Sequence, residues 1–105
     1  MKRIINGRRF DTEAKHTKAV ASGSWGSGGD FDAYDETLYR TSHGNWFVAG
    51  CGGPHTKYGR NAEGGGIGGG PGLFPLTMEQ AFDWLEYHEE TDLLEEYFGE
   101  GIEDA

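Results

Sequence analysis

The chain has 105 residues, enough for one small domain with a limited hydrophobic core. Its formal net charge is −9, which is divided unevenly: residues 1–60 hold nine basic and six acidic residues, whereas residues 61–105 hold twelve acidic residues and no base. The single cysteine excludes an internal disulfide, and the lack of an apolar leader or of a run of roughly 20 apolar residues predicts a soluble cytoplasmic protein.

The first predicted element is a β-hairpin. Asn6-Gly7 adopts the positive φ values of a tight hairpin turn without strain, so we expect strands over residues 2–5 and 8–11. A weaker third strand is predicted over residues 15–24. The glycine and serine content of residues 23–29, which include Trp25, indicates a loop.

A second hairpin is predicted over residues 36–41 and 45–50, turned by Ser42-His43-Gly44. Its strands are rich in the bulky residues that β-sheets favour, namely Leu38, Tyr39, Trp46, Phe47 and Val48. Residues 55–58 could add an edge strand. We therefore expect an antiparallel sheet of four to five strands within residues 2–58.

Residues 59–75 contain a run of glycines from 64 to 72, interrupted only by Ile67 and Pro71. Because this run has almost no side chains to pack, we interpret residues 59–75 as a flexible loop that links the sheet to the C-terminal segment. It does not match a phosphate-binding loop, because no Lys-Ser or Lys-Thr follows it.

A helical segment is predicted over residues 76–99. Thr77 and Gln80 form a capping-box pattern, and Met78, Ala81, Phe82 and Leu85 follow at the spacing of one buried helix face. The later apolar residues fall on a different face, so we expect two helices, over 78–88 and 92–98, with Thr91 as the second N-cap and Gly99 as the end. Residues 100–105 are predicted to form a frayed acidic tail. The predicted fold is a single α+β domain, residues 1–105, whose helices cover one sheet face.

Acidic residues form a second stripe on the helical segment. Glu79, Asp83, Glu86 and Glu90 recur at nearly the helical period, displaced by about 100° from the apolar face. A solvated outer face would explain them, since acidic residues near a helix N-terminus are stabilised by the helix dipole. Surface helices usually pair Glu with Lys four residues away, however, and no Lys or Arg follows Arg60. The absence of Lys and Arg favours the interpretation that this negative surface binds a basic partner.

Other chemistry has little support in the sequence. Cys51 and His55, with His43 or His16, provide too few ligands at recognisable spacing for a structural zinc site, and Cys51 is more simply a small buried residue at a strand end. A Cys51 nucleophile with His55 or His43 as base lacks an orienting third group. We therefore predict no catalytic residue, no metal and no cofactor.

Direct nucleic-acid binding is also not expected. Five cations in and after the first hairpin could contact a phosphate backbone, but a half-molecule of charge −12 opposes this. The acidic helices fit the opposite role, engaging a surface lined with Lys and Arg, with aromatic residues beside them as anchors. The predicted partner-binding residues are Glu79, Asp83, Trp84, Glu86, Tyr87, Glu90, Asp92, Glu95 and Glu96.

Three segments resemble a group of small proteins carried by phages and other bacterial mobile elements. They are residues 5–12, residues 38–47 and the stretch from Pro75-Leu76-Thr77 into residues 81–86. Acidic proteins of this size from such elements include the anti-CRISPR inhibitors, which bind CRISPR effector complexes and often occupy their nucleic-acid sites. The resemblance, one of size, charge and architecture, implies a non-enzymatic inhibitor in the cytoplasm of a bacterial host cell, bound to a basic subunit of a CRISPR-Cas effector.

Two alternatives remain at this point. One is a non-catalytic interaction or regulatory module, either a monomer or a homodimer, that uses the sheet aromatics around Trp46. The other is a thiol- or metal-dependent enzyme built on Cys51. No membrane partner is expected.

Overall fold

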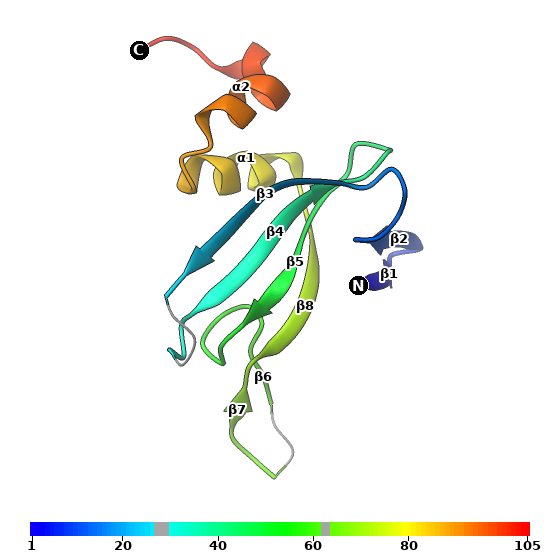
Figure 1. Ribbon diagram of the computed structural model, residues 1–105, viewed down its shortest axis with the longest axis vertical. Coiled ribbons are helices and arrows are strands. Elements are labelled where there is room, and N and C mark those ends of the chain that lie inside the picture. Colours follow the sequence, from blue (N-terminus) through cyan, green and yellow to red (C-terminus); the bar gives the residue numbers. More distant parts are fainter. Residues whose placement is uncertain (27–29, 62–63) are drawn as a thin grey trace.

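The chain has an α+β fold in which a four-stranded antiparallel sheet is followed by two C-terminal helices (Figure 1). This computed structural model describes residues 1–26, 30–61 and 64–105. The strands are β1 (Lys2–Ile5), β2 (Arg8–Asp11), β3 (Lys18–Trp25), β4 (Tyr34–Arg40), β5 (Trp46–Gly52), β6 (Arg60–Asn61), β7 (Ile67–Gly68) and β8 (Gly70–Leu76). The helices are α1 (Met78–Tyr87), α2 (Thr91–Phe98) and the short 3₁₀ helix η1 (Gly99–Gly101).

The main sheet has the strand order β3-β4-β5-β8, with every neighbouring pair antiparallel. The predicted second hairpin is confirmed as β4 and β5. Its turn depends on Gly44, whose φ is +83°, and is closed by a hydrogen bond from the Thr41 amide to the Asn45 carbonyl at 2.8 Å. The predicted loop over residues 23–29 is wrong at its start, because Gly23 to Trp25 belong to β3. Its residues 27–29 lie outside the described part.

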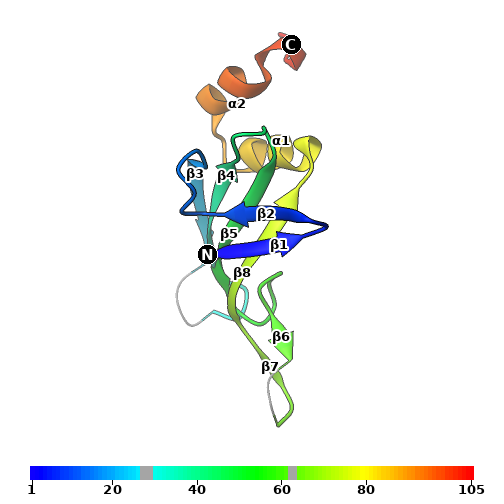
Figure 2. The ribbon, with the colours of Figure 1, turned by 90° about the vertical axis from the view of Figure 1, so that its right-hand side faces the viewer.

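The first hairpin forms as predicted, with β1 and β2 joined by Asn6 and Gly7 at φ values of 52° and 76°. It is not part of the main sheet, contrary to the expectation of one sheet. Instead it is a separate two-stranded sheet that lies across one face of the main sheet (Figure 2). Phe10 packs edge-on against Phe47 at 5.5 Å between ring centroids, and Arg3 donates a hydrogen bond to the Leu73 carbonyl at 2.9 Å.

The predicted flexible loop over residues 59–75 is wrong over residues 70–75, which belong to β8, a full strand paired with β5, and at β6 and β7. Its residues 62–63 lie outside the described part. Proline lacks a donor N–H, but β8 is an edge strand, where Pro71 and Pro75 are tolerated. Leu73 is completely buried on one face. Gly72 faces the other side, where an added Cβ would lie 2.9 Å from the Tyr58 ring. Glycine here therefore makes room for an aromatic side chain.

Residues 55–58 do not form the predicted edge strand; they are turns. The segment 53–59 instead folds back over the sheet, where Tyr58 is 2 % exposed and packs against Phe74 at 5.4 Å between ring centroids. Beyond it, β6 and β7 pair in a two-stranded extension at the end of the molecule far from the helices (Figure 1).

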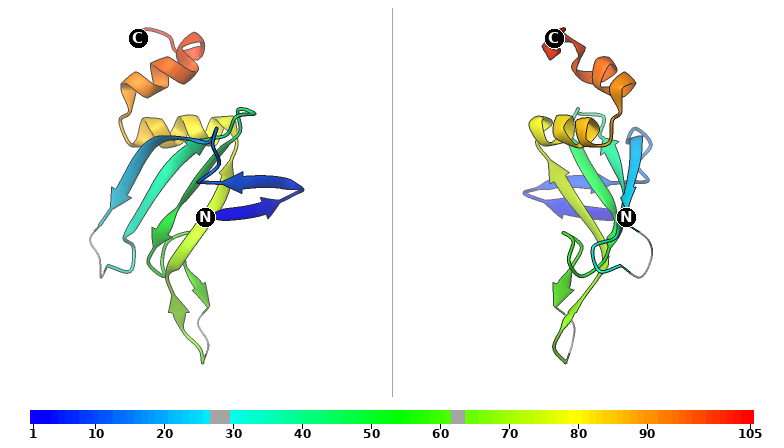
Figure 3. Two further views of the ribbon diagram at one scale, coloured as in Figure 1. Left: turned by 45° about the vertical axis from the view of Figure 1, so that its right-hand side comes forward. Right: turned by 90° about the vertical axis from the view of Figure 1, so that its left-hand side faces the viewer.

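The core has one cluster on each face of the main sheet. On the hairpin side, Phe10 packs with Phe47, Ala49 and Leu73. On the other side, sheet residues pack with α1 in a cluster formed by Leu38, Trp46, Val48, Ala81, Trp84 and Leu85. Here α1 crosses one end of the sheet and α2 lies beyond it (Figure 3). The helices thus cover one end of the face rather than the whole face, and the segment 53–59 occupies part of the remainder.

Candidate functional site

The first helix begins directly after β8, at the capping box that the sequence predicts. The Thr77 hydroxyl accepts a hydrogen bond from the Gln80 amide at 3.1 Å, and the Gln80 side-chain oxygen accepts one from the Thr77 amide at 2.9 Å. Two otherwise unpaired N–H groups of the first turn are satisfied in this way. Because the last strand runs into this cap without a loop, the orientation of α1 is tied to the sheet.

The buried face of α1 is rotated from the prediction. Ala81 and Leu85 are completely buried, as expected, but Met78 is 65 % exposed and Trp84 is 9 % exposed. Trp84 therefore packs in the core and also lines a second cavity described below, and its role in partner binding stays a prediction. The helix is rotated because the Trp84 indole donates a hydrogen bond to the buried Glu36 carboxylate on β4, which is described below.

The break between the helices is confirmed, with α1 ending at Tyr87 and α2 beginning at Thr91. The predicted N-cap is wrong, since Glu90 holds that position without a side-chain hydrogen bond. The chain reverses at Glu89, whose φ is 55°. Two aromatic contacts hold α2 against the sheet, from Trp46 to Tyr97 at 5.2 Å and from Trp46 to Phe98 at 5.7 Å.

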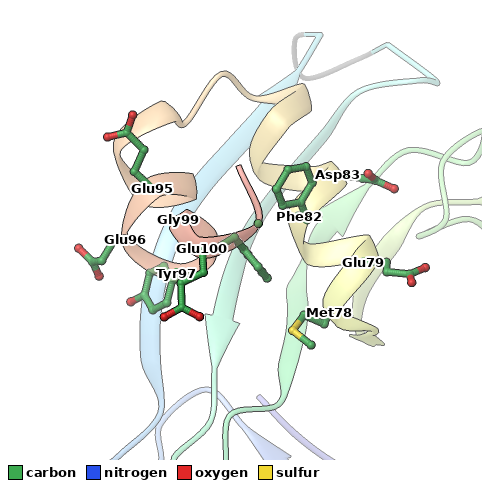
Figure 4. Close-up of a pocket in the computed structure, with 11 residues that line it drawn as sticks. Met78, Glu79, Phe82, Asp83, Glu95, Glu96, Tyr97, Gly99 and Glu100 are labelled. Carbon is green, nitrogen blue, oxygen red and sulfur yellow. The ribbon is translucent and has the colours of Figure 1, made fainter. Parts of the chain in front are cut away.

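A groove of about 890 Å³ lies between α1 and α2 (Figure 4). Apolar side chains line it: the rings of Phe82 and Phe98 meet at 5.4 Å, and Met78 lies alongside. Five acidic residues also line it, namely Glu79, Asp83, Glu95, Glu96 and Glu100. Figure 4 shows the side chains of the α1 acids and of Glu95 and Glu96 directed to opposite sides, with Phe82 and Met78 between them. We call this the acidic groove.

Four of the nine predicted partner-binding residues meet at the acidic groove: Glu79, Asp83, Glu95 and Glu96. The others do not line it. Glu86 and Asp92 are exposed elsewhere on the helices, Glu90 is half-buried between them, and Tyr87 is 67 % exposed beside a second cavity. The predicted continuous stripe is thus divided, because α1 ends before Glu90 and α2 takes a new direction.

The groove carboxylates have few counter-cations. Within residues 1–26, 30–61 and 64–105, the one ion pair that involves a helical acid joins Lys18 to Glu96 at 4.0 Å, with both side chains more than half exposed. Exposed pairs of this length contribute little. Arg3 and Arg8 are engaged elsewhere, with the Leu73 carbonyl and the Asn45 side chain, whereas Arg40 stacks on the ring of Tyr97 in α2 at 5.2 Å. The negative charge of the groove is therefore largely uncompensated.

A buried carboxylate that the sequence analysis missed lies on the helix-covered sheet face. Glu36 on β4 is 3 % exposed and accepts three hydrogen bonds: from Lys57 Nζ at 2.7 Å, from Tyr58 Oη at 2.7 Å and from Trp84 Nε1 at 2.6 Å. Burial alone would raise the pKa of the Glu36 carboxyl. The three hydrogen bonds and the Lys57 charge outweigh burial and hold this pKa below its usual range.

One signal in the sequence could have revealed Glu36. Side chains alternate between the faces of a strand, so Glu36 shares a face with Tyr34 and Leu38. Leu38 is completely buried, and an acid two residues from it must enter the same face. Its partners come from residues 57, 58 and 84, however, and no local pattern connects those positions to β4.

The alternatives built on Cys51 or on the sheet aromatics gain nothing from the structure. Cys51 is exposed at the end of β5, which corrects the expectation of a buried thiol. Within the described residues, no three His, Cys, Asp or Glu side chains are grouped so that they could hold a metal ion. Trp46 is 4 % exposed and Phe47 is completely buried. These two aromatic residues belong to the core.

Comparison with protein-family models, with curated proteins and with solved structures found no match. Among the described helices, none has the length and apolar content needed to cross a membrane.

Proposed function

We propose that this protein is a non-enzymatic inhibitor that binds a basic, nucleic-acid-handling surface of another protein through the acidic groove. The observation that carries the proposal is the combination of an apolar floor with largely uncompensated carboxylates on both sides. Charged rims steer a partner of opposite charge, whereas exposed apolar side chains such as Met78 provide contact area.

The leading target is a subunit of a CRISPR-Cas effector, so the protein would be of the anti-CRISPR type. Such a subunit carries Lys and Arg where it holds guide or target nucleic acid, because phosphate contacts dominate that binding. A protein that covers those cations competes with the nucleic acid. The acidic groove supplies carboxylates that can form charge-assisted hydrogen bonds with them.

The proposal is tested by phage plating on bacteria that carry defined CRISPR-Cas systems, with and without this protein. Inhibition of a matching system should restore plaque formation. The quadruple variant E79K/D83K/E95K/E96K should lose this effect, because it reverses the rim of the acidic groove. Plaque counts that stay low with every system tested would contradict the CRISPR target.

A matched control reverses four exposed acids that do not line the groove, in E13K/D35K/E103K/D104K. It changes the net charge by the same amount and should retain inhibition. If both variants lose activity equally, total charge rather than the acidic groove is responsible. For the isolated complex, a rise in salt should slow association, because exposed charges are screened beyond about 8 Å at physiological ionic strength.

A further inference from the structure

A second cavity, of about 470 Å³, opens on the sheet side of α1 between this helix and the segment 53–59. We call it the aromatic cleft. The rings of Tyr34, Trp84, Tyr87 and His88 line it, and Glu36 and Lys57 lie in its lining. Trp84 and His88 are in contact at 4.1 Å between ring centroids. The acidic groove and the aromatic cleft share one residue, Asp83.

The charges of the aromatic cleft favour a cation. Asp32, Glu36 and Asp83 contribute three carboxylates against one ammonium, Lys57. That ammonium is already bound to Glu36 at 2.7 Å. Asp32 lies 3.4 Å from His55, and within the described residues no ion pair involves Asp83. An incoming cation would therefore meet two carboxylates that no Lys or Arg neutralises, whereas an anion would meet repulsion.

Lys57 places one organic cation in the lining of the cleft, on the Glu36 carboxylate. Its Nζ atom lies on the buried carboxylate and 5.7 Å from the centroid of the Tyr58 ring, within cation–π distance. Tyr58 itself does not line the cleft, but the rings that do, Tyr34 and Tyr87 among them, offer aromatic surface to a second cation. Tyr87 is 67 % exposed, so its ring is accessible to an incoming group.

A guanidinium suits these walls better than a second ammonium. It is planar, stacks on aromatic faces, is weakly hydrated and donates to carboxylates in a fork. We propose that the aromatic cleft binds a guanidinium on an aliphatic stem, that is, an arginine side chain, carried by a polypeptide or presented as a free small molecule. This inference is independent of the inhibitor function, because it requires neither α2 nor a CRISPR effector.

The test is a titration of the ¹⁵N-labelled protein with N-acetyl-arginine methylamide, which mimics arginine within a chain, and with free arginine. The assigned indole N–H signal of Trp84 should shift and saturate with a dissociation constant of roughly millimolar order, as expected for a ligand of this size. The Trp25 indole, which does not line the cleft, should not move. Saturation by the capped compound alone assigns the ligand to a chain, saturation by free arginine alone assigns it to a small molecule, and equal saturation shows that the side chain alone is recognised.

Two controls make the test decisive. The matching citrulline compounds have the same shape without the charge and should bind about tenfold more weakly, as expected when a cation–π contact and its carboxylate partner are lost. Y87A should weaken arginine binding several-fold, whereas E86A, an exposed neighbour outside the cleft, should not. Equal binding of citrulline, tighter binding of N-acetyl-glutamate methylamide, or no saturable shift of the Trp84 signal would overturn the proposal.

Discussion

The indole N–H of Trp84 on α1 donates a hydrogen bond to the carboxylate of Glu36 on β4 at 2.6 Å. This bond connects two residues 48 positions apart and ties the helix to the middle of the sheet. Lys57 and Tyr58 contact the other carboxylate oxygen, so one buried acid joins the sheet, α1 and the segment 53–59. The acidic groove depends on this arrangement, because it is α1 that presents Glu79 and Asp83.

Replacing Glu36 with Gln should destabilise the protein by roughly 2–4 kcal/mol. The amide removes the charge opposite Lys57 and places an N–H₂ group among three donors, so at least one buried partner loses its acceptor. Urea denaturation followed by tryptophan fluorescence measures the change. D35N, the exposed neighbour on the same strand, should change stability by less than about 0.5 kcal/mol. Equal effects of the two substitutions would show that the buried network contributes nothing specific.

The stability of the protein should fall in acid partly through Glu36. Its pKa is lower in the folded than in the unfolded chain, so the folded state favours the ionised form. This contribution is complete above the unfolded value of about 4.3 and is lost as the pH falls through the lower folded pKa. The difference in unfolding free energy between the wild type and E36Q should therefore shrink below about pH 4.3. A difference that stays constant from pH 7 to pH 3 would contradict the assignment.

Local signals predicted the elements whose geometry is fixed by neighbouring residues. Asn6-Gly7 specifies its turn and Thr77 with Gln80 specifies a helix start, because in each case the interacting groups lie within three residues. The strand formed by residues 70–76 could not be predicted in this way. Glycine is disfavoured in strands, and only pairing with β5 and the packing of Tyr58 on Gly72 explain β8.

In the candidate site, too, the features set by local sequence were predicted and those set by long-range contacts were not. Sequence analysis identified the acids of the acidic groove because their abundance without cations is visible in the sequence. It misplaced Trp84, because burial of that residue depends on Glu36 far away in the chain. It predicted the break between the two helices, but not the direction that α2 takes after Glu89, which separates Glu90 from the stripe.

Gly23 on β3 leaves room for the side chain of His88 at the end of α1. A Cβ at this position would lie 2.5 Å from Cε1 of His88, the residue that caps the helix, so G23A must displace the imidazole or the helix. We expect a loss of about 1–3 kcal/mol in unfolding free energy. The control is G99A, since Gly99 has a helical φ of −53° and open space at its Cβ position. It should be neutral or stabilising by up to about 1 kcal/mol. Thermal unfolding measures the stability of both variants. A G23A protein as stable as G99A would contradict the close packing of His88 on Gly23.

Met78 offers a way to separate binding from folding. Its side chain is 65 % exposed at the acidic groove, so M78A should change stability by less than about 0.5 kcal/mol. If the groove binds a partner, the same truncation removes apolar contact area and should weaken the complex several-fold. Calorimetric titration of the target measures this, with I67A as the control, because Ile67 is similarly exposed but lies in β7 at the far end. Unchanged affinity for M78A would exclude the groove floor from the interface.

The most direct test of the acidic groove is amide hydrogen exchange of the protein alone and in complex with a CRISPR-Cas effector, the proposed target. We predict added protection concentrated in α1, α2 and the 3₁₀ turn, residues 78–101, with little change in β1 and β2. Protection confined to the β1–β2 hairpin or to the β6–β7 extension, with the helices unchanged, would contradict the account.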